Sequence, residues 1–468
     1  MKVLIALILP SVLGYLIVSL ADGRGGRGGL GEKLAIGFGA GYGIVVYEIF
    51  LMGLAGIPLT LTFITAIIIL SIFLLIVIRL RLPFGAGASA RIEGVTHQRD
   101  PFKIFFASAL ILWITLKVLF VLYGGLYFPI LSQDTWWNWS GTAKFFFYSK
   151  SLVLDPSNEH FFGTGYRPFL GYPLLNPLMQ LWTALIIGDF HEALVKACMP
   201  VYYISCLAVV FFAVKKEGGF YAGLLTAFFL SAAPLMTYHA VDAYSDLPLA
   251  FYVLSGSVFL WRYMEEGGES RAALSGLLFA MGAFTKNEGV VYLAAGFMAI
   301  TAFNLLEKRR EWKSILYFSV PALLYIGPWL LFKAYYGIGY GHGSGVGVGA
   351  EDVAGGLVLS GALHPGVIPV FFKEIFLTIN HGLVFPFLAL IAVLGVRTLM
   401  RSNIKYLILI IILAAAVFLA DYIVTDDFIF VFNRTGMNRN ALTFLPLSFL
   451  AAGLLTSRLL KGLSKKEV

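Results

Sequence analysis

The chain has 468 residues, of which 59% are hydrophobic and only 13% are charged, with a formal net charge of +8. A soluble domain carries about 25% charged residues, so this composition excludes a soluble protein with one large core and indicates a polytopic membrane protein. The two cysteines, Cys198 and Cys206, lie in one apolar stretch and suggest neither a disulfide framework nor a zinc site. Basic cytoplasmic loops account for the positive charge, and a nucleic-acid partner is not required.

Apolar stretches of the length needed to cross a bilayer, about 17–25 residues, recur along the whole chain. They run over 3–20, 34–52, 58–78, 104–123, 195–214, 220–241, 247–263, 272–285, 289–305, 315–333, 375–396, 405–424 and 440–457. A further apolar piece, 174–187, starts next to two prolines and is followed by no basic residue, so we expect it to lie in the interface. The predicted fold class is an all-α polytopic membrane protein with about 13 transmembrane helices and interfacial helices in the first large outer loop.

The placement of lysine and arginine orients these spans, because short cytoplasmic loops carry an excess of positive charge. The basic loops are 24–33, 79–103, 215–216, 262–271, 308–313, 397–405 and the tail 458–466. All of them fall on one side if the N-terminus is outside and the C-terminus is inside. The opposite, extracytoplasmic face then receives 124–194, 242–246, 286–288, 334–374 and 425–439.

These assignments divide the chain into an N-terminal three-helix membrane segment at 1–103, a core at 104–333 that contains the outer loop 124–194, and a C-terminal part at 334–468 with the last three spans. Residues 1–21 could instead be a signal peptide, but the single Lys2 is a weak basic region, so a helix is favoured. The glycine-rich segment 336–352 is either a lid over a site or a disordered loop.

The outer loop opens with SQDTWWNWSGTAKFFF at 132–147, in which Asp134 stands beside Trp136, Trp137 and Trp139. A carboxylate placed just beyond a membrane span sits near the lipid–water boundary, where it can reach a lipid headgroup. The alternative is an aromatic belt with an incidental aspartate. Its aromatic residues recur at helical spacing, so we expect an amphipathic interfacial helix.

Three more polar clusters reach the same face. His239, Tyr244 and Asp246 precede Pro248 at a helix start, where Asp246 could equally serve as an N-cap. Lys286 and Glu288 occupy a tight turn, either as an internal ion pair or with the cation aimed at a phosphate. The loops also carry Arg167, Arg434 and Arg439, and the last two oppose the positive-inside trend, so they call for a local anionic partner.

Acids alone would indicate a cation pathway, whereas acids combined with arginines and tryptophans indicate a bound sugar phosphate. Arginine forks pair with phosphate oxygens, aromatic faces stack on sugar rings, and a carboxylate can accept a proton from an attacking hydroxyl.

The order of motifs resembles the GT-C superfamily of polyprenyl-phosphate-dependent glycosyltransferases, in particular the branch with protein O-mannosyltransferases and the lipid A aminoarabinose transferase. The matching features, over roughly 104–457, are Asp134 in QDTWWNWSGTAKFF, then YPLLNPL, then YSDLP with Asp246, then TKNEG with Lys286, and Arg439 in NRNALTFLPL before the last span. The resemblance is one of order and placement, not a strict signature.

By that resemblance, Asp134 is the catalytic base that activates an acceptor hydroxyl, and a polyprenyl phosphate leaves with inversion. Arg439 and Lys286, helped by Arg167 or Arg434, would hold the phosphate. The other expected substrate-binding residues are Asp246, Glu288, Trp136, Trp137, Tyr244 and His239. The implied partners are a polyprenyl-phosphate sugar donor, membrane lipids and a glycan, lipid or protein acceptor, at the outer face of the plasma membrane.

Two departures from the family pattern stand out. Many relatives place a second acid beside the first, whereas Gln133 and Thr135 flank Asp134 here, so no metal ligands are predicted and the need for a divalent cation stays open. The three spans before residue 104 are extra. Two other functions remain: a transporter or flippase of a lipid-linked or anionic substrate, which usually shows internal repeats and mid-membrane charges, and a ligase or polymerase of surface glycans.

Overall fold

The computed structural model describes residues 1–23, 28–81, 100–152, 170–307, 311–338 and 363–464. Within these ranges every regular element is a helix, which confirms the all-α fold class. Arg167 and most of the glycine-rich segment 336–352 lie outside the described residues.

Nine helices in the described part of the chain are long and apolar enough to cross a membrane. They are α1(Lys2–Asp22), α2(Leu30–Leu54), α3(Leu61–Arg81), α4(Pro101–Tyr127), α9(Glu192–Val195) continuing into α10(Cys198–Gly218), α15(Gly289–Leu306), α16(Trp312–Tyr336), α20(Ile404–Val424) and α22(Gly436–Ser464). A tenth is counted if α11(Phe220–Ala232) and α12(Pro234–Val241), which are bent by 67°, form one span.

The difference from the expected 13 spans has local causes. The stretch 375–396 is divided into α17(Val367–Leu377), η3(Ile379–His381) and α18(Val384–Leu394), because Gly382 and Leu383 take positive φ values of 64° and 57°. Beyond it lies the short α19(Val396–Met400). The helices α13(Asp246–Glu266) and α14(Glu269–Ala283) do form, but α14 has only 15 residues. Protein surrounds α13 from Asp246 to Met264, so its polar residues meet no lipid.

The N-terminal helices are part of the core instead of an appendage. In α1 and α2, glycines allow a close crossing: a Cβ on Gly41 would lie 1.7 Å from the carbonyl oxygen of Pro10. Tyr252 of α13 donates to the Gly39 carbonyl of α2 at 2.9 Å, and Tyr325 of α16 donates to that of Gly43 at 2.7 Å. Among the candidate spans in the described residues, α3 and α4 are the least enclosed, with 11% and 17% of their apolar windows buried.

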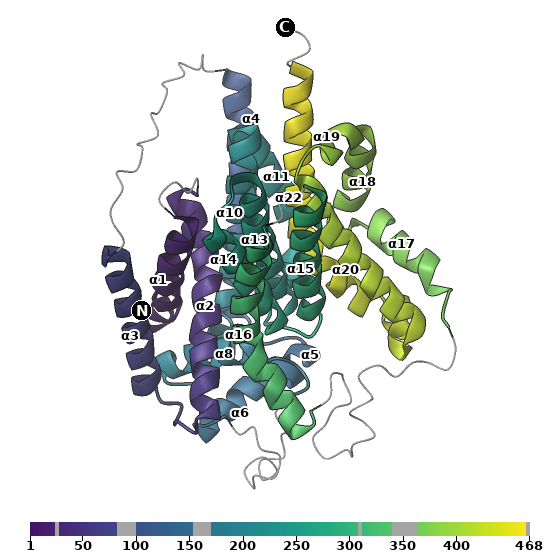
Figure 1. Cartoon of the computed structure of the whole chain (residues 1–468). Helices are drawn as coiled ribbons and strands as arrows, with labels where there is room; N and C mark the ends of the chain where they lie inside the picture. Colours follow the sequence, from purple (N-terminus) through teal and green to yellow (C-terminus); the bar gives the residue numbers. More distant parts are fainter. Residues whose placement is uncertain (24–27, 82–99, 153–169, 308–310, 339–362, 465–468) are drawn as a thin grey trace.

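The short helices of the outer loop gather at one end of the bundle (Figure 1). They are α5(Gln133–Thr135), the π-helical turn η1(Trp136–Ser140), α6(Gly141–Ser149) and α8(Leu175–Ile187). The α8 side chains from Leu175 to Leu185 are buried in protein, so this helix supports the site from within.

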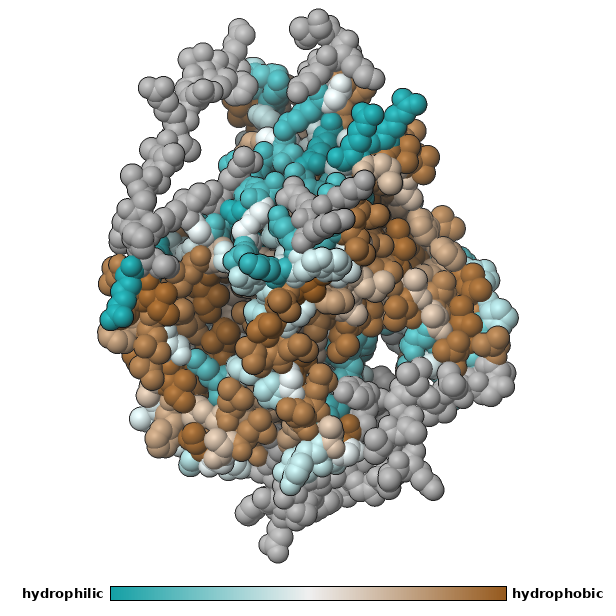
Figure 2. All heavy atoms as spheres, viewed as in Figure 1, coloured by the Kyte–Doolittle hydropathy of each residue, from teal (hydrophilic) through white to brown (hydrophobic). Residues whose placement is uncertain are grey.

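Ion pairs between helix ends mark the other end of the bundle, which we call the basic end. It holds Lys33, Arg262, Arg271, Lys405 and Arg458 together with their carboxylate partners. Asp246 begins α13, whereas Arg262 lies in its last turns, so the two ends are separated by most of a 21-residue helix, about 24 Å. Figure 2 shows hydrophilic residues at the end where the chain terminates and a hydrophobic band below them.

Two short elements, η4(Asp426–Phe428) and α21(Ile429–Phe432), connect α20 to α22 at the end where α5 lies. They bring the chain back to the site end, so that the first turns of α22 face α13. Arg439 is thereby placed among the carboxylates of the outer loops.

Candidate active site

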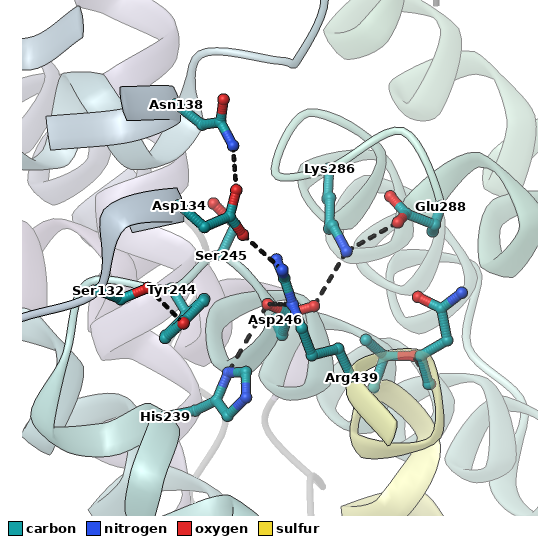
Figure 3. Close-up of polar contacts among 12 residues, drawn as sticks. Ser132, Asp134, Asn138, His239, Tyr244, Ser245, Asp246, Lys286, Glu288 and Arg439 are labelled. Carbon is teal, nitrogen blue, oxygen red and sulfur yellow. Dashed lines mark hydrogen bonds and ion pairs between the residues drawn. The ribbon is translucent and has the colours of Figure 1, made fainter. Parts of the chain in front are cut away.

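Asp134 lies in α5, and both of its carboxylate oxygens are engaged (Figure 3). Asn138 donates from Nδ2 to Oδ1, and Arg439 donates from Nη1 to Oδ2 at 2.5 Å. Asn138 follows Asp134 by four positions, the spacing at which helical side chains meet. That spacing is the signal by which Asn138 could have been found from the sequence.

Arg439 joins two carboxylates. Besides its contact with Asp134, its Nε lies 3.2 Å from Oδ2 of Asp246. Its guanidinium carbon lies 5.0 Å from the centroid of the Tyr244 ring and 5.8 Å from that of Trp139. The planar guanidinium can therefore serve two acids from different edges while its face packs against aromatic rings.

Asp246 is fully buried at the start of α13. Its Oδ1 accepts from Lys286 Nζ at 3.0 Å, and His239 Nδ1 lies 3.6 Å from its Oδ2. No side-chain hydrogen bond caps this helix. The N-cap alternative is therefore not adopted: this carboxylate is directed to the cations and not to the helix backbone.

Lys286 stands in the turn between α14 and α15 and contacts two acids, Asp246 and, at 2.7 Å, Oε1 of Glu288. Burial lowers the pKa of Lys286, but the charges of Asp246 and Glu288 outweigh it and raise the pKa above its usual value. The ammonium is thus held charged inside the protein. This position is compatible with both alternatives from the sequence: an internal ion pair of Lys286 with Glu288, and a lysine available to bind a phosphate.

Two aromatic residues absent from the predicted binding set border the cluster. Trp139 is buried, and its ring centroid lies 5.9 Å from that of Tyr172. Burial raises the pKa of Tyr172, and the nearby charge of Glu288 raises it further. Tyr172 begins the YPLLNPL motif, so its position in that motif was the available signal.

Of the predicted residues, the structure brings together Asp134, Asp246, Lys286, Glu288, Arg439, Tyr244 and His239. Arg434 instead forms an ion pair with Glu374 at 3.2 Å, with its own side chain 61% exposed. Trp137 is 54% exposed, and Trp136 lies under the ammonium of Lys144, 5.7 Å from its ring centroid. The tryptophan whose ring faces the guanidinium of Arg439 is instead Trp139.

The cluster combines three carboxylates, two cations and several aromatic rings at one end of the bundle. Among the residues that the structure describes, no group of three or more His, Cys, Asp or Glu side chains is arranged to hold a metal ion. Whether the protein needs a divalent cation therefore stays open. Chemically, the cluster offers carboxylates for proton transfer and cations for an anionic group.

No family model and no curated protein matches the chain. Two crystal structures of ArnT from Cupriavidus metallidurans are similar to it. The apo structure gives a TM-score of 0.50 at 16% sequence identity, over 75% of this chain and 60% of that one. The structure bound to undecaprenyl phosphate gives 0.52 at 14% identity, over 74% and 60%.

The chain thus spans about 60% of the length of the ArnT chains that it resembles. At this level of identity the likeness shows that the fold is the ArnT membrane fold.

Proposed function

We propose that this protein is an integral membrane glycosyltransferase that moves a sugar from a polyprenyl-phosphate carrier to an acceptor hydroxyl, with inversion at the anomeric carbon. Asp134 is the general base, and Arg439 with Lys286 holds the donor phosphate. The reaction takes place at the extracytoplasmic face of the plasma membrane.

The observation that carries this proposal is the convergence of four side chains from four separate elements. Asp134 comes from α5, Asp246 from α13, Lys286 from the turn after α14, and Arg439 from α22. Such a set costs stability unless its charges are paired, so a cluster of this kind at a helix end is a candidate site. One ArnT structure with this fold is bound to undecaprenyl phosphate, which supports a polyprenyl-phosphate donor.

In the proposed reaction, Asp134 accepts the proton of the acceptor hydroxyl as its oxygen attacks the anomeric carbon. The bond between that carbon and the phosphate oxygen breaks, and the polyprenyl phosphate leaves with the bonding electron pair. Arg439 and Lys286 stabilise the charge that develops on the phosphate. Asp246, Tyr244 and Trp139 keep Arg439 in place.

Donor binding would change the contacts of Asp134. Asn138 and Arg439 each donate to one of its oxygens, and each oxygen keeps a further lone pair that can accept a proton. A phosphate that takes over the Nη edge of Arg439 would supply this change while Nε stays on Asp246. The donor would then bind before the acceptor is activated.

The test is mass spectrometry of surface glycolipids and glycoproteins from cells with and without the active protein. A sugar-bearing species that disappears with the protein, and with its Asp134→Asn variant, supports a transferase and identifies the product. A transporter would instead change the location of a lipid-linked species without a new glycosidic bond. Loss of a whole transferred glycan, not of one sugar, would indicate a ligase or polymerase.

A further inference from the structure

Asp242 is a buried carboxylate next to the site, and the proposed reaction assigns it no chemistry. It lies directly after α12, with 3% of its surface exposed. Its Oδ2 accepts from the backbone N–H of Ser132 at 2.9 Å, and its Oδ1 accepts from that of Ala243 at 2.8 Å. Both oxygens thus bind backbone, one in its own loop and one in the segment that leads into α5.

A second contact joins the same two segments. The hydroxyl of Ser132 forms a hydrogen bond with that of Tyr244 (Figure 3). Ser132 precedes Asp134 by two residues, and Asp242 precedes Asp246 by four. The segment that carries the proposed base is therefore attached to the loop that carries the buried acid under Arg439.

These contacts close a ring. Asp134 is joined to Arg439, Arg439 to Asp246, and Asp246 through its own loop to Asp242, which holds Ser132. Within this ring, Arg439 is the member that would change partners when a phosphate arrives. The Asp242–Ser132 contact then remains as a restraint on the position of Asp134, together with the Ser132–Tyr244 and Asn138–Asp134 hydrogen bonds.

A buried cation supports the carboxylate of Asp242. Lys196, which is fully buried, donates from Nζ to the carbonyl oxygen of Val241 at 2.5 Å, and its charge acts on Asp242. Lys196 lies between α9 and α10. A buried carboxylate is tolerated where hydrogen bonds satisfy it, and Asp242 accepts one from each of two backbone N–H groups, with the charge of Lys196 nearby.

We propose that Asp242 is a positioning residue that holds the 132–135 segment so that the carboxylate of Asp134 keeps its place once Arg439 turns to the donor phosphate. This inference rests on the proposed function for its effect on turnover. Whether Asp242 holds the 132–135 segment in place can be measured without any substrate.

The substrate-free test uses a cysteine at Thr135, which is fully buried in α5 and close to cysteine in size. With a membrane-impermeant maleimide, Thr135→Cys should be labelled very slowly when it is the only substitution. In the double variant Thr135→Cys, Asp242→Ala, the labelling rate should be at least tenfold higher. The native Cys198 and Cys206 are buried and report on the global fold. Glu48→Gln, which removes a partly buried carboxyl from α2, is the control and should leave Thr135→Cys protected.

The substrate-dependent test compares product formation with donor binding. Misplacing a reacting group by about 1 Å can cost on the order of a hundredfold in rate, so Asp242→Ala should lower product by tenfold or more. Its affinity for undecaprenyl phosphate should stay within about twofold, because Arg439 and Lys286 are untouched. Asp242→Asn keeps one acceptor oxygen, so its product formation should lie between that of the parent protein and that of Asp242→Ala.

Continued protection of Thr135→Cys in the Asp242→Ala protein, with normal product, would overturn the inference. Labelling of Cys198 as well would mean that this variant unfolds, and Asp242→Asn then decides: reduced product with Cys198 protected supports the inference, and full product overturns it. An Asp134→Asn protein with full product would instead refute the proposed function and leave the labelling result standing.

Discussion

Arg439 contacts Asp134 through Nη1 at 2.5 Å while its Nε holds Asp246 at 3.2 Å. One guanidinium thus connects the exposed side of the cluster to its buried side: Asp134 is 31% exposed and Asp246 is fully buried. A group that approaches from the open side meets Asp134 and the Nη edge of Arg439 first. The arrangement therefore separates an anchoring contact from an exchangeable one, and several measurements can test this division.

Asp134→Asn should lower sugar transfer by about 10²–10⁴-fold, the range for loss of a general base. The amide keeps the size of the side chain and can still accept from Arg439, so the protein should fold and bind undecaprenyl phosphate. The measurement is the product identified by mass spectrometry, normalised to protein in the membrane. Near-normal product would remove Asp134 from the mechanism.

Arg439→Lys and Arg439→Ala should weaken binding of undecaprenyl phosphate in graded order. Lysine keeps the positive charge but cannot serve two carboxylates from separate edges, and alanine removes the charge as well. Charge-assisted hydrogen bonds contribute about 1.5–3 kcal/mol each, so alanine should reduce the affinity by about tenfold or more. Equal affinities for the three proteins, measured by titration in detergent, would show that the phosphate binds elsewhere.

Glu32→Gln should destabilise the protein from the basic end. Glu32 of α2 and Arg262 of α13 form an ion pair in which both side chains are at most 3% exposed. Removing one partner of a buried pair costs about 3–5 kcal/mol, because the other charge is left behind. Thermal unfolding in detergent measures this effect. Lys103→Ala, which breaks an exposed pair with Asp100, is the control and should change little; equal losses in both variants would contradict the role given to α2.

Lys286 should stay charged across the physiological range. Its pKa is raised above the ordinary value because Asp246 and Glu288 outweigh the effect of burial. The stability that the ammonium contributes is therefore complete below the unfolded-state pKa and is lost only as the pH rises through the still higher folded-state value. Between about pH 7 and pH 9, the affinity for undecaprenyl phosphate should change with pH equally in wild type and Lys286→Gln. A slope present only in wild type would mean that Lys286 titrates there.

The sidedness of the site can be measured with single cysteines. Gln133 beside Asp134 and Arg401 between α19 and α20 are both exposed. An impermeant maleimide added to intact cells should label Gln133→Cys and should reach Arg401→Cys only after permeabilisation. Ser245 is fully buried and is unsuitable for this purpose. The reverse pattern would place the site in the cytoplasm and exclude a donor in the outer leaflet.

The helical membrane class was predictable because the transfer of apolar side chains out of water is a local, additive property of a stretch of residues. The same additivity failed at 375–396, where positive φ values at Gly382 and Leu383 divide an apolar stretch into separate helices. It also missed that α13 is enclosed by protein, since hydropathy does not distinguish lipid from neighbouring helices.

The sequence by itself determined the all-helical membrane class and the placement of acids, cations and aromatic residues at the ends of particular spans. Only the tertiary structure decided which of them meet: Arg439 on Asp134 and Asp246, Arg434 away on Glu374, and Trp139 in place of Trp137 beside the guanidinium. The reason is physical. Hydropathy follows from each short stretch alone, whereas pairing depends on how helices distant in the chain pack and rotate against one another.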